Sequence, residues 1–224
     1  MEDPLKIEEL IEKIEAKENV SKVNTSRIHS MNNLFSAMFH RGLNFNQPLN
    51  DWDVSNVYEM QWMFYKTNKF NQPLDKWDVS NVANMYGMFD GTLSFNQPLN
   101  DWDVSHVENM GNMFQNAKSF NQPLNDWDVS NVTDMGGMFQ GAKKFNQSLN
   151  EWNVSNVYSI ELMFANASNY TSSMKDWKLR ANCDYTCFLD KCHLWQLVNT
   201  VEDLPMQNGE RIELKGNRKT WKVL

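Results

Sequence analysis

The sequence is poor in several features that mark whole classes of protein. It has 3 cysteines, 4 histidines and 6 prolines in 224 residues. Three cysteines cannot all pair in disulfides, so this count predicts a reducing compartment. No apolar run approaches the roughly 20 residues of a membrane-spanning helix. The acidic start of the chain lacks the basic and apolar regions of a secretory signal, which slightly favours the cytoplasm over the cell surface or secretion.

Positive charge is also scarce. Lys and Arg number 21 against 28 Asp and Glu, which gives a net charge of −7 and a pI near 5.1. Nucleic-acid-binding domains carry clustered Lys and Arg, so the composition argues against such a partner. No Gly-rich phosphate loop occurs, and the four histidines fall in no nucleophile or metal motif. The sequence therefore predicts a protein that is not an enzyme and needs no cofactor.

What the sequence has in abundance is internal repetition, with a period of 25 residues. A complete unit reads F-N-Q-P-L-x-x-W-D-V-S-N-V-x-x-M-x-x-M-F. A fixed period of this length is typical of repeat proteins, whose units stack on one another to bury a continuous core. The recurring tryptophans are Trp52, Trp77, Trp102, Trp127, Trp152 and Trp177.

The repeat divides the chain into three parts. Residues 20–179 are expected to form seven coils. Residues 1–19 are expected to form a capping helix, because their apolar residues recur at helical spacing. Residues 180–224 are expected to form a second cap, with a helix over 187–198 and a short hairpin within 211–224. Caps are expected because the outermost coil of a stack exposes its hydrophobic face.

Within each coil, the spacing of apolar residues predicts one strand and one short helix. Residues 49–54 follow L-x-x-L-x-L with Trp in the middle, and they alternate as a half-buried strand does. Ser55 suits a helix N-cap, and the apolar residues of 57–64 recur at a 3-3-1 spacing that lies on one helical face. We therefore expect an α/β repeat solenoid: a leucine-rich-repeat-like, right-handed stack of parallel strands and short helices with terminal caps.

The unit W-D-V-S-N-V-x-x-M-x-x-M-F, followed by F-N-Q-P-L, resembles the repeat of BspA-like leucine-rich-repeat surface proteins. The resemblance covers residues 20–179. It implies a leucine-rich-repeat fold and a role in adhesion or protein–protein contact. The chain departs from the family in two ways: Val57 and its copies replace the usual asparagine, and the sequence given predicts no signal peptide.

Acidic residues beside the expected strand form the first candidate site. Outward-pointing carboxylates on stacked strands would form a row about 5 Å apart. Such a row suits a basic protein partner or Ca²⁺, which prefers carboxylate oxygens. The alternative, which strict repetition favours, is that each Asp binds backbone N–H groups two residues on, in an Asx-turn. The residues are Asp53, Asp78, Asp103 and Asp128, with Asp101 and Asp126 beside them.

Aromatic residues at variable positions form the second candidate. Scaffold positions repeat, so binding specificity is expected where the copies differ. Tyr58, Trp62, Tyr65 and Tyr86 stand where other coils have small or polar residues. Clustered exposed aromatics suit interface anchors. The alternative is that the capping helix simply buries them.

Cysteines near the C-terminus are the third candidate. Cys183, Cys187, Cys192 and His193 offer four possible zinc ligands. Their spacing departs from that of standard structural zinc sites, so buried thiols are favoured and no metal site is expected. The repeated methionines are interpreted as core, because Met fills irregular gaps.

Together these features favour a non-catalytic protein-interaction module of leucine-rich-repeat type. The alternative is a structural or adhesive surface protein that binds carbohydrate or matrix, with assistance from Ca²⁺.

Overall fold

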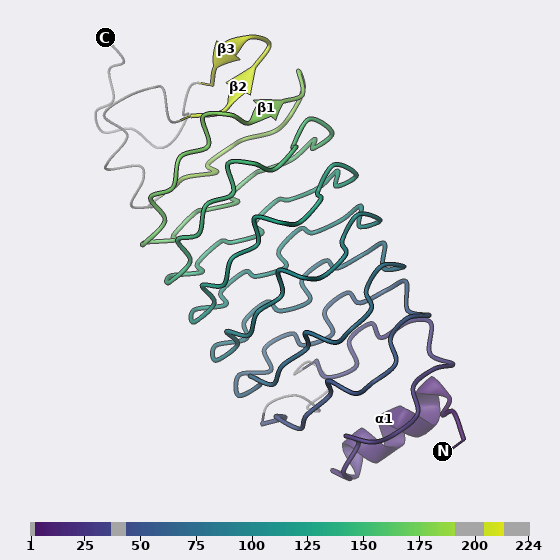
Figure 1. The fold of residues 1–224 in the computed structure, drawn as a ribbon. Helices are drawn as coiled ribbons and strands as arrows, with labels where there is room; N and C mark the ends of the chain where they lie inside the picture. Colours follow the sequence, from purple (N-terminus) through teal and green to yellow (C-terminus); the bar gives the residue numbers. More distant parts are fainter. Residues whose placement is uncertain (1–2, 37–43, 191–203, 213–224) are drawn as a thin grey trace.

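A computed structural model describes residues 3–36, 44–190 and 204–212, and a stack of coils makes up most of it (Figure 1). Each regular coil takes 25 residues, so residues 25 apart in the sequence lie side by side. Isolated parallel bridges join one coil to the next at the same position of the repeat. The bridged residues are, in order, Ser30, Glu59, Asn84, Asn109, Asp134, Ser159 and Asp184.

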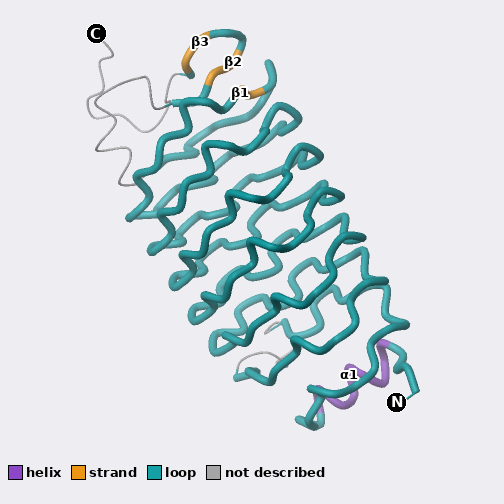
Figure 2. The backbone as a smooth tube through the Cα atoms, in the orientation of Figure 1, coloured by secondary structure: helices purple, strands orange, loops and turns teal. Residues whose placement is uncertain are grey.

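The expected α/β solenoid of parallel strands and short helices is wrong. Among the described residues the only α-helix is α1 (Ile7–Glu15). The strands β1 (Lys178–Leu179), β2 (Met206–Gln207) and β3 (Glu210–Arg211) form one small sheet, in which β2 pairs in parallel with β1 and antiparallel with β3. The other described residues form loops, turns and single bridges (Figure 2).

Backbone hydrogen bonding explains why residues 57–66 are not helical. Every second N–H leaves the coil: Met60 donates to the carbonyl of Asn84 at 2.9 Å, and residues 62, 64 and 66 follow the same pattern. Among the intervening N–H groups, those of residues 63 and 65 close tight turns, as when Met63 donates to the carbonyl of Met60 at 3.3 Å. An α-helix would need all these bonds within its own segment. The 3-3-1 spacing therefore comes from consecutive turns.

Positive backbone φ angles also interrupt any helix. Trp62 has φ 56° and Lys66 has φ 55°, and their copies in other coils share this left-handed conformation. L-residues visit this region as single residues in turns, never as helices. The first set is Asn33, Trp62, Gly87, Asn112, Gly137, Leu162 and Cys187; the second is Lys66, Gly91, Asn116, Gly141 and Asn166.

The strand expected over residues 49–54 is absent too. The N–H of Trp52 donates to the carbonyl of Leu49 at 3.0 Å, which closes a turn. The indole then bonds between coils, as when Nε1 of Trp77 donates to the carbonyl of Leu49 at 2.9 Å. The inter-coil bridges run through Glu59 and its copies instead. The L-x-x-W pattern thus marks a turn and an inter-coil hydrogen bond.

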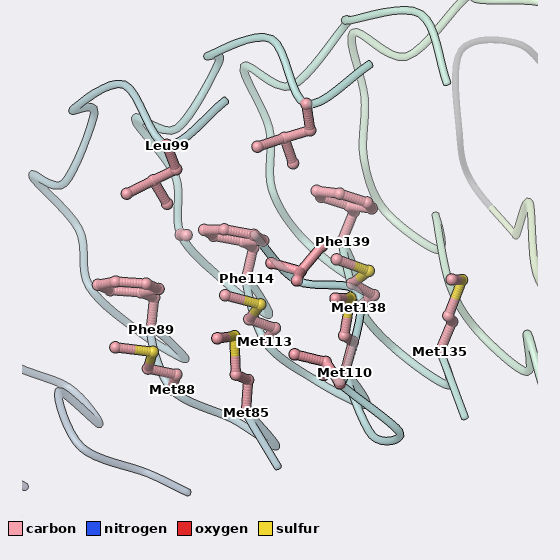
Figure 3. Close-up of a cluster of buried hydrophobic side chains, with 14 of the residues drawn as sticks. Met85, Met88, Phe89, Leu99, Met110, Met113, Phe114, Met135, Met138 and Phe139 are labelled. Atoms are coloured by element: carbon pink, nitrogen blue, oxygen red, sulfur yellow. The ribbon is translucent and has the colours of Figure 1, made fainter. Parts of the chain in front are cut away.

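The interior of the stack is built from columns of identical side chains. The methionines Met85, Met88, Met110 and Met113 have no exposed surface, which confirms the prediction that the methionines are core (Figure 3). Buried phenylalanines stack through neighbouring coils, with centroids 5.5 Å apart for Phe89 and Phe114. Each coil therefore buries its apolar face only against its neighbours, as repeat units do.

Asparagines on the return segment hold neighbouring coils together. The side-chain oxygen of Asn46 accepts from the N–H of Asn71 at 3.0 Å, and Asn71 accepts in turn from Asn96 at 2.9 Å. The series continues to Thr171. Amide side chains therefore satisfy backbone N–H groups of adjacent coils.

The ends of the stack differ from its coils. Leu10 and Ile14 of α1 are buried against the core, and the N–H of Leu5 donates to the carbonyl of Asn24. Of the helix expected over 187–198, the described part is a turn and the rest lies outside the described residues. The hairpin expected within 211–224 lies almost wholly outside them. Over the described ranges, no helix is long and apolar enough to cross a membrane.

Candidate functional site

Three of the four predicted aromatic residues come together at one corner of the second and third coils. The rings of Trp62 and Tyr65 have centroids 4.9 Å apart and are nearly perpendicular, at 87°. The rings of Trp62 and Tyr86 have centroids 5.0 Å apart and an interplanar angle of 76°. We call Trp62, Tyr65 and Tyr86 the aromatic cluster. Tyr58 is exposed, and its ring stacks instead with that of His29, with centroids 6.4 Å apart.

Trp62 occupies one of the left-handed backbone positions although it is bulky and only half-buried. Its indole lies on the backbone of Gly87, where an added Cβ would be 2.4 Å from Cε3. The N–H of Trp62 donates to the carbonyl of Tyr86 at 2.9 Å. A non-glycine residue in this conformation costs about 1–2 kcal/mol. The glycine below the ring, and not the capping helix, therefore accommodates it.

Polar groups fix the other two rings. Nζ of Lys66 lies 4.7 Å from the centroid of the Tyr65 ring, in a cation–π contact. The hydrogen bond with Tyr65 raises the pKa of this lysine. The hydroxyl of Tyr86 accepts from Nδ2 of Asn112 at 2.6 Å. The cluster thus presents apolar rings with a cation at its edge.

A buried carboxyl lies beside this cluster, and the sequence analysis missed it. Asp90 is 4% exposed, and its carbonyl accepts from the N–H of Lys66 at 2.7 Å. Burial raises the pKa of Asp90 to about 6, opposed by a hydrogen bond with Asn116 and by the charge of Lys66. The sequence held one sign of it: at the equivalent position, the neighbouring coils have the neutral residues Tyr65 and Gln115.

The acidic row has a structural role that the alternative interpretation predicted. Oδ1 of Asp53 accepts from the N–H of Ser55 at 3.1 Å and from its hydroxyl at 2.6 Å. Asp78, Asp103 and Asp128 repeat the backbone bond, which confirms the Asx-turns. Hydrogen bonds from Ser105 lower the pKa of Asp103.

The carboxylates beside this row differ from one another. Asp101 is exposed, while Asp126 accepts from the amides of Asn100 and Asn125. Asp51 forms ion pairs with Lys22 at 2.5 Å and Lys76 at 3.1 Å, and these lysines lower its pKa. Lysines therefore accompany these carboxylates at the N-terminal end of the row, around Asp51.

The cysteine candidate divides between described and undescribed residues. Cys183 and Cys187 are free thiols, and burial raises the pKa of Cys183 to about 11. Cys192 and His193 lie outside the described residues. In the three described ranges, no group of three or more His, Cys, Asp or Glu side chains is placed to hold a metal ion.

Comparison with known proteins identifies a family. The sequence matches the family described as "Mycoplasma protein of unknown function, DUF285" twice, over residues 6–119 and 94–197. The two matches overlap and together include the whole stack, so the chain is a repeat protein. No curated protein and no solved structure matches it.

Proposed function

We propose that this chain, which belongs to the DUF285 family of Mycoplasma proteins, is a non-catalytic protein-interaction module that binds its partner at the aromatic cluster. The observation that carries the proposal is the strained, half-buried Trp62. Two other coils have glycine at this position, where glycine carries no steric cost. Strain that persists at a surface where it does not serve stability suggests selection for function.

The composition of the cluster supports a protein partner. Tryptophan and tyrosine are the residues most enriched among interface anchors, and they lose little conformational entropy on binding. Trp62 and Tyr86 are held by Gly87 and Asn112, so their orientation is largely set before a partner binds. The repeated columns of the other coils offer no comparable group of differing side chains. A binding role thus fits a place where the copies of the repeat differ.

The test compares two variants of the same left-handed column. Trp62→Gly removes the indole and relaxes the backbone. Leu162→Gly makes the matching change four coils away, at φ 57°, and serves as the control. Each protein is immobilised and exposed to extracts of the source organism. Captured proteins are identified, purified and titrated against each variant by calorimetry.

We expect one captured partner to bind the wild type and Leu162→Gly alike and to bind Trp62→Gly at least about tenfold more weakly, as for an interface hot spot. A partner that binds all three equally would remove the aromatic cluster from the interface. If no protein is captured by the wild type, the interaction-module proposal fails in this form.

A second candidate is an adhesive surface protein that binds carbohydrate, as the resemblance to BspA-like leucine-rich-repeat proteins implies. The exposed Tyr58, paired with His29, favours it because aromatic faces also stack on sugars. A glycan array probed with the wild type and Tyr58→Ala tests this function. Glycan binding that Tyr58→Ala abolishes would place adhesion ahead of protein recognition.

A further inference from the structure

Most charged residues of the stack between residues 44 and 170 lie at two edges. Between residues 44 and 170 there are six Lys and Arg residues, and five of them lie in the stacked loops 65–69, 115–119 and 140–144. All five are exposed or lie at the loop surface, and the one carboxyl of the equivalent loops, Asp90, is buried. We call Lys66, Lys69, Lys118, Lys143 and Lys144 the lysine edge.

The opposite charge gathers at another part of each coil. Nine exposed carboxylates occupy the turns around residues 51, 76, 101, 126 and 151, with Lys76 as the one cation of these turns. We call them the acidic edge: Asp51, Asp53, Asp75, Asp78, Asp101, Asp103, Asp126, Asp128 and Glu151.

The core separates the two edges. The rings of Phe64 and Phe70, which flank the loop of Lys66 and Lys69, stack at 4.2 Å. Trp77 flanks the acidic turn, and its ring lies 6.3 Å from that of Phe64, inside the stack. The edges therefore lie on different sides of the same row of buried rings, and a single molecule cannot neutralise one with the other.

Ion pairs within the molecule leave most of both edges unneutralised. Among the described residues, the ion pairs of the acidic edge are confined to Asp51, which meets Lys22 and Lys76. Over the same residues no ion pair involves the lysine edge, although Lys66 lies over the ring of Tyr65. Four lysines and eight carboxylates thus face solvent on complementary surfaces.

We infer that the lysine edge of one copy binds the acidic edge of a second copy, so that stacks associate side by side. Both edges repeat with the same coil spacing, close to 4.8 Å where backbones pair. Two copies lying in the same direction therefore match row to row, whereas another acidic partner would match this spacing only by coincidence. The contact uses two different surfaces, so each copy keeps one free edge and association continues as an open array.

This inference is independent of the proposed function, because it requires none of the rings of the aromatic cluster. Solvent-exposed ion pairs contribute individually about fivefold or less to an association constant, so the contact is weak and sensitive to salt. The association becomes appreciable only where several coils of the two copies pair at once, or where the protein concentration is high.

The experiment is sedimentation velocity on the full chain over a concentration series. We expect the average mass to rise with concentration in about 0.05 M NaCl and to return to the monomer in about 1 M NaCl, where the screening length falls to about 3 Å. A wild type that stays monomeric at every concentration in low salt overturns the inference. So does association that high salt leaves unchanged.

Two charge-reversal variants identify the surfaces. One carries Lys69→Glu, Lys118→Glu, Lys143→Glu and Lys144→Glu. The other carries Asp51→Lys, Asp75→Lys, Asp101→Lys, Asp126→Lys and Glu151→Lys, which leaves four carboxylates against six lysines at that edge and keeps the Asp residues of the Asx-turns. Each variant alone is expected to remain monomeric, and an equimolar mixture is expected to associate, since each then meets an edge of opposite charge.

The mixture also controls for misfolding of the variants, because association of the two can be recovered only if both stacks are folded. Self-association of either variant at the level of the wild type would overturn the edge assignment. A mixture that stays monomeric while the wild type associates would do the same. Trp62→Gly should associate as the wild type does; if it does not, the contact lies at the aromatic cluster and the charged-edge inference is wrong.

Discussion

The indole of Trp62 covers Gly87 so closely that a Cβ on the glycine would lie 2.4 Å from Cε3 and 2.6 Å from Cζ3 of the ring. Gly87 is also left-handed, with φ 61°. The two residues are copies of the same position in successive coils. The bulky copy is therefore accommodated only because the next coil has the smallest residue.

Replacing Gly87 with alanine should destabilise the protein for two separable reasons. Alanine at this φ costs about 1 kcal/mol, and displacing the indole adds about 1–3 kcal/mol of overpacking. Urea unfolding of Gly87→Ala measures the total. In a Trp62→Gly background only the backbone cost should remain, so the double-mutant cycle gives the ring contribution. Equal losses in both backgrounds would show that the ring moves aside freely.

Asp90 should make stability depend on pH. Its pKa rises from 3.8 to about 6 on folding, so the folded state favours the protonated carboxyl. This stabilising contribution is complete below pH 3.8 and is lost as the pH rises through about 6. Above that pH the buried carboxylate costs roughly 3 kcal/mol.

Asp90→Asn removes this cost, so the variant should gain stability over the wild type as the pH increases. The gain should be small near pH 4 and approach about 3 kcal/mol near pH 8. Thermal unfolding of both proteins across this range measures it. The control is Asp78→Asn, whose carboxylate is exposed. A constant difference between Asp90→Asn and the wild type at all pH values would mean that Asp90 does not titrate as described.

Side-chain identity predicted the core, because repeated apolar residues such as Met and Phe have few other roles. It did not predict the backbone. A 3-3-1 spacing of Val57, Met60 and Met63 is produced equally by a helix and by successive turns, and buried positions are the same in both. The distinguishing signal was the column that contains Gly87 and Gly137, since recurring glycine indicates positive φ.

The candidate site was only partly predictable for a related reason. Trp62, Tyr65 and Tyr86 were grouped by their departure from the repeat, and they do meet. Tyr58 departs in the same way but is directed elsewhere, because turns rather than a helix place it. The pKa of Asp90 depends on its burial and on Asn116 and Lys66 in neighbouring coils, so no single unit reveals it.

The tryptophan column should contribute through its polar atom as well as its size. Trp127 is 3% exposed, and its Nε1 donates to the carbonyl of Leu99 at 2.8 Å. Trp127→Phe removes volume and one of the two donors to that carbonyl, which still accepts from the N–H of Trp102 at 3.1 Å, so we expect a loss of about 1–3 kcal/mol. Phe114→Leu changes packing alone and is the comparison. Equal losses in chemical denaturation would show that the indole hydrogen bond contributes nothing net.

A second ladder of asparagine side chains joins successive coils and is broken at one of them. Nδ2 of Asn81 donates to the carbonyl of Ser55 at 2.8 Å, and Nδ2 of Asn131 donates to that of Ser105 at 2.7 Å. Between these coils His106 replaces the asparagine, and within the described part of the chain no corresponding bond reaches Ser80.

Changing His106→Asn should complete this ladder and stabilise the protein by about 0.5–1.5 kcal/mol, the usual net value of one such bond. The reverse change, Asn131→His, should cost a similar amount, because it removes the amide that Ser105 accepts from. Urea unfolding of the two variants tests the pair together. If His106→Asn destabilises the chain, the histidine contributes a stabilising contact of its own, and the missing asparagine bond is not a defect of this coil.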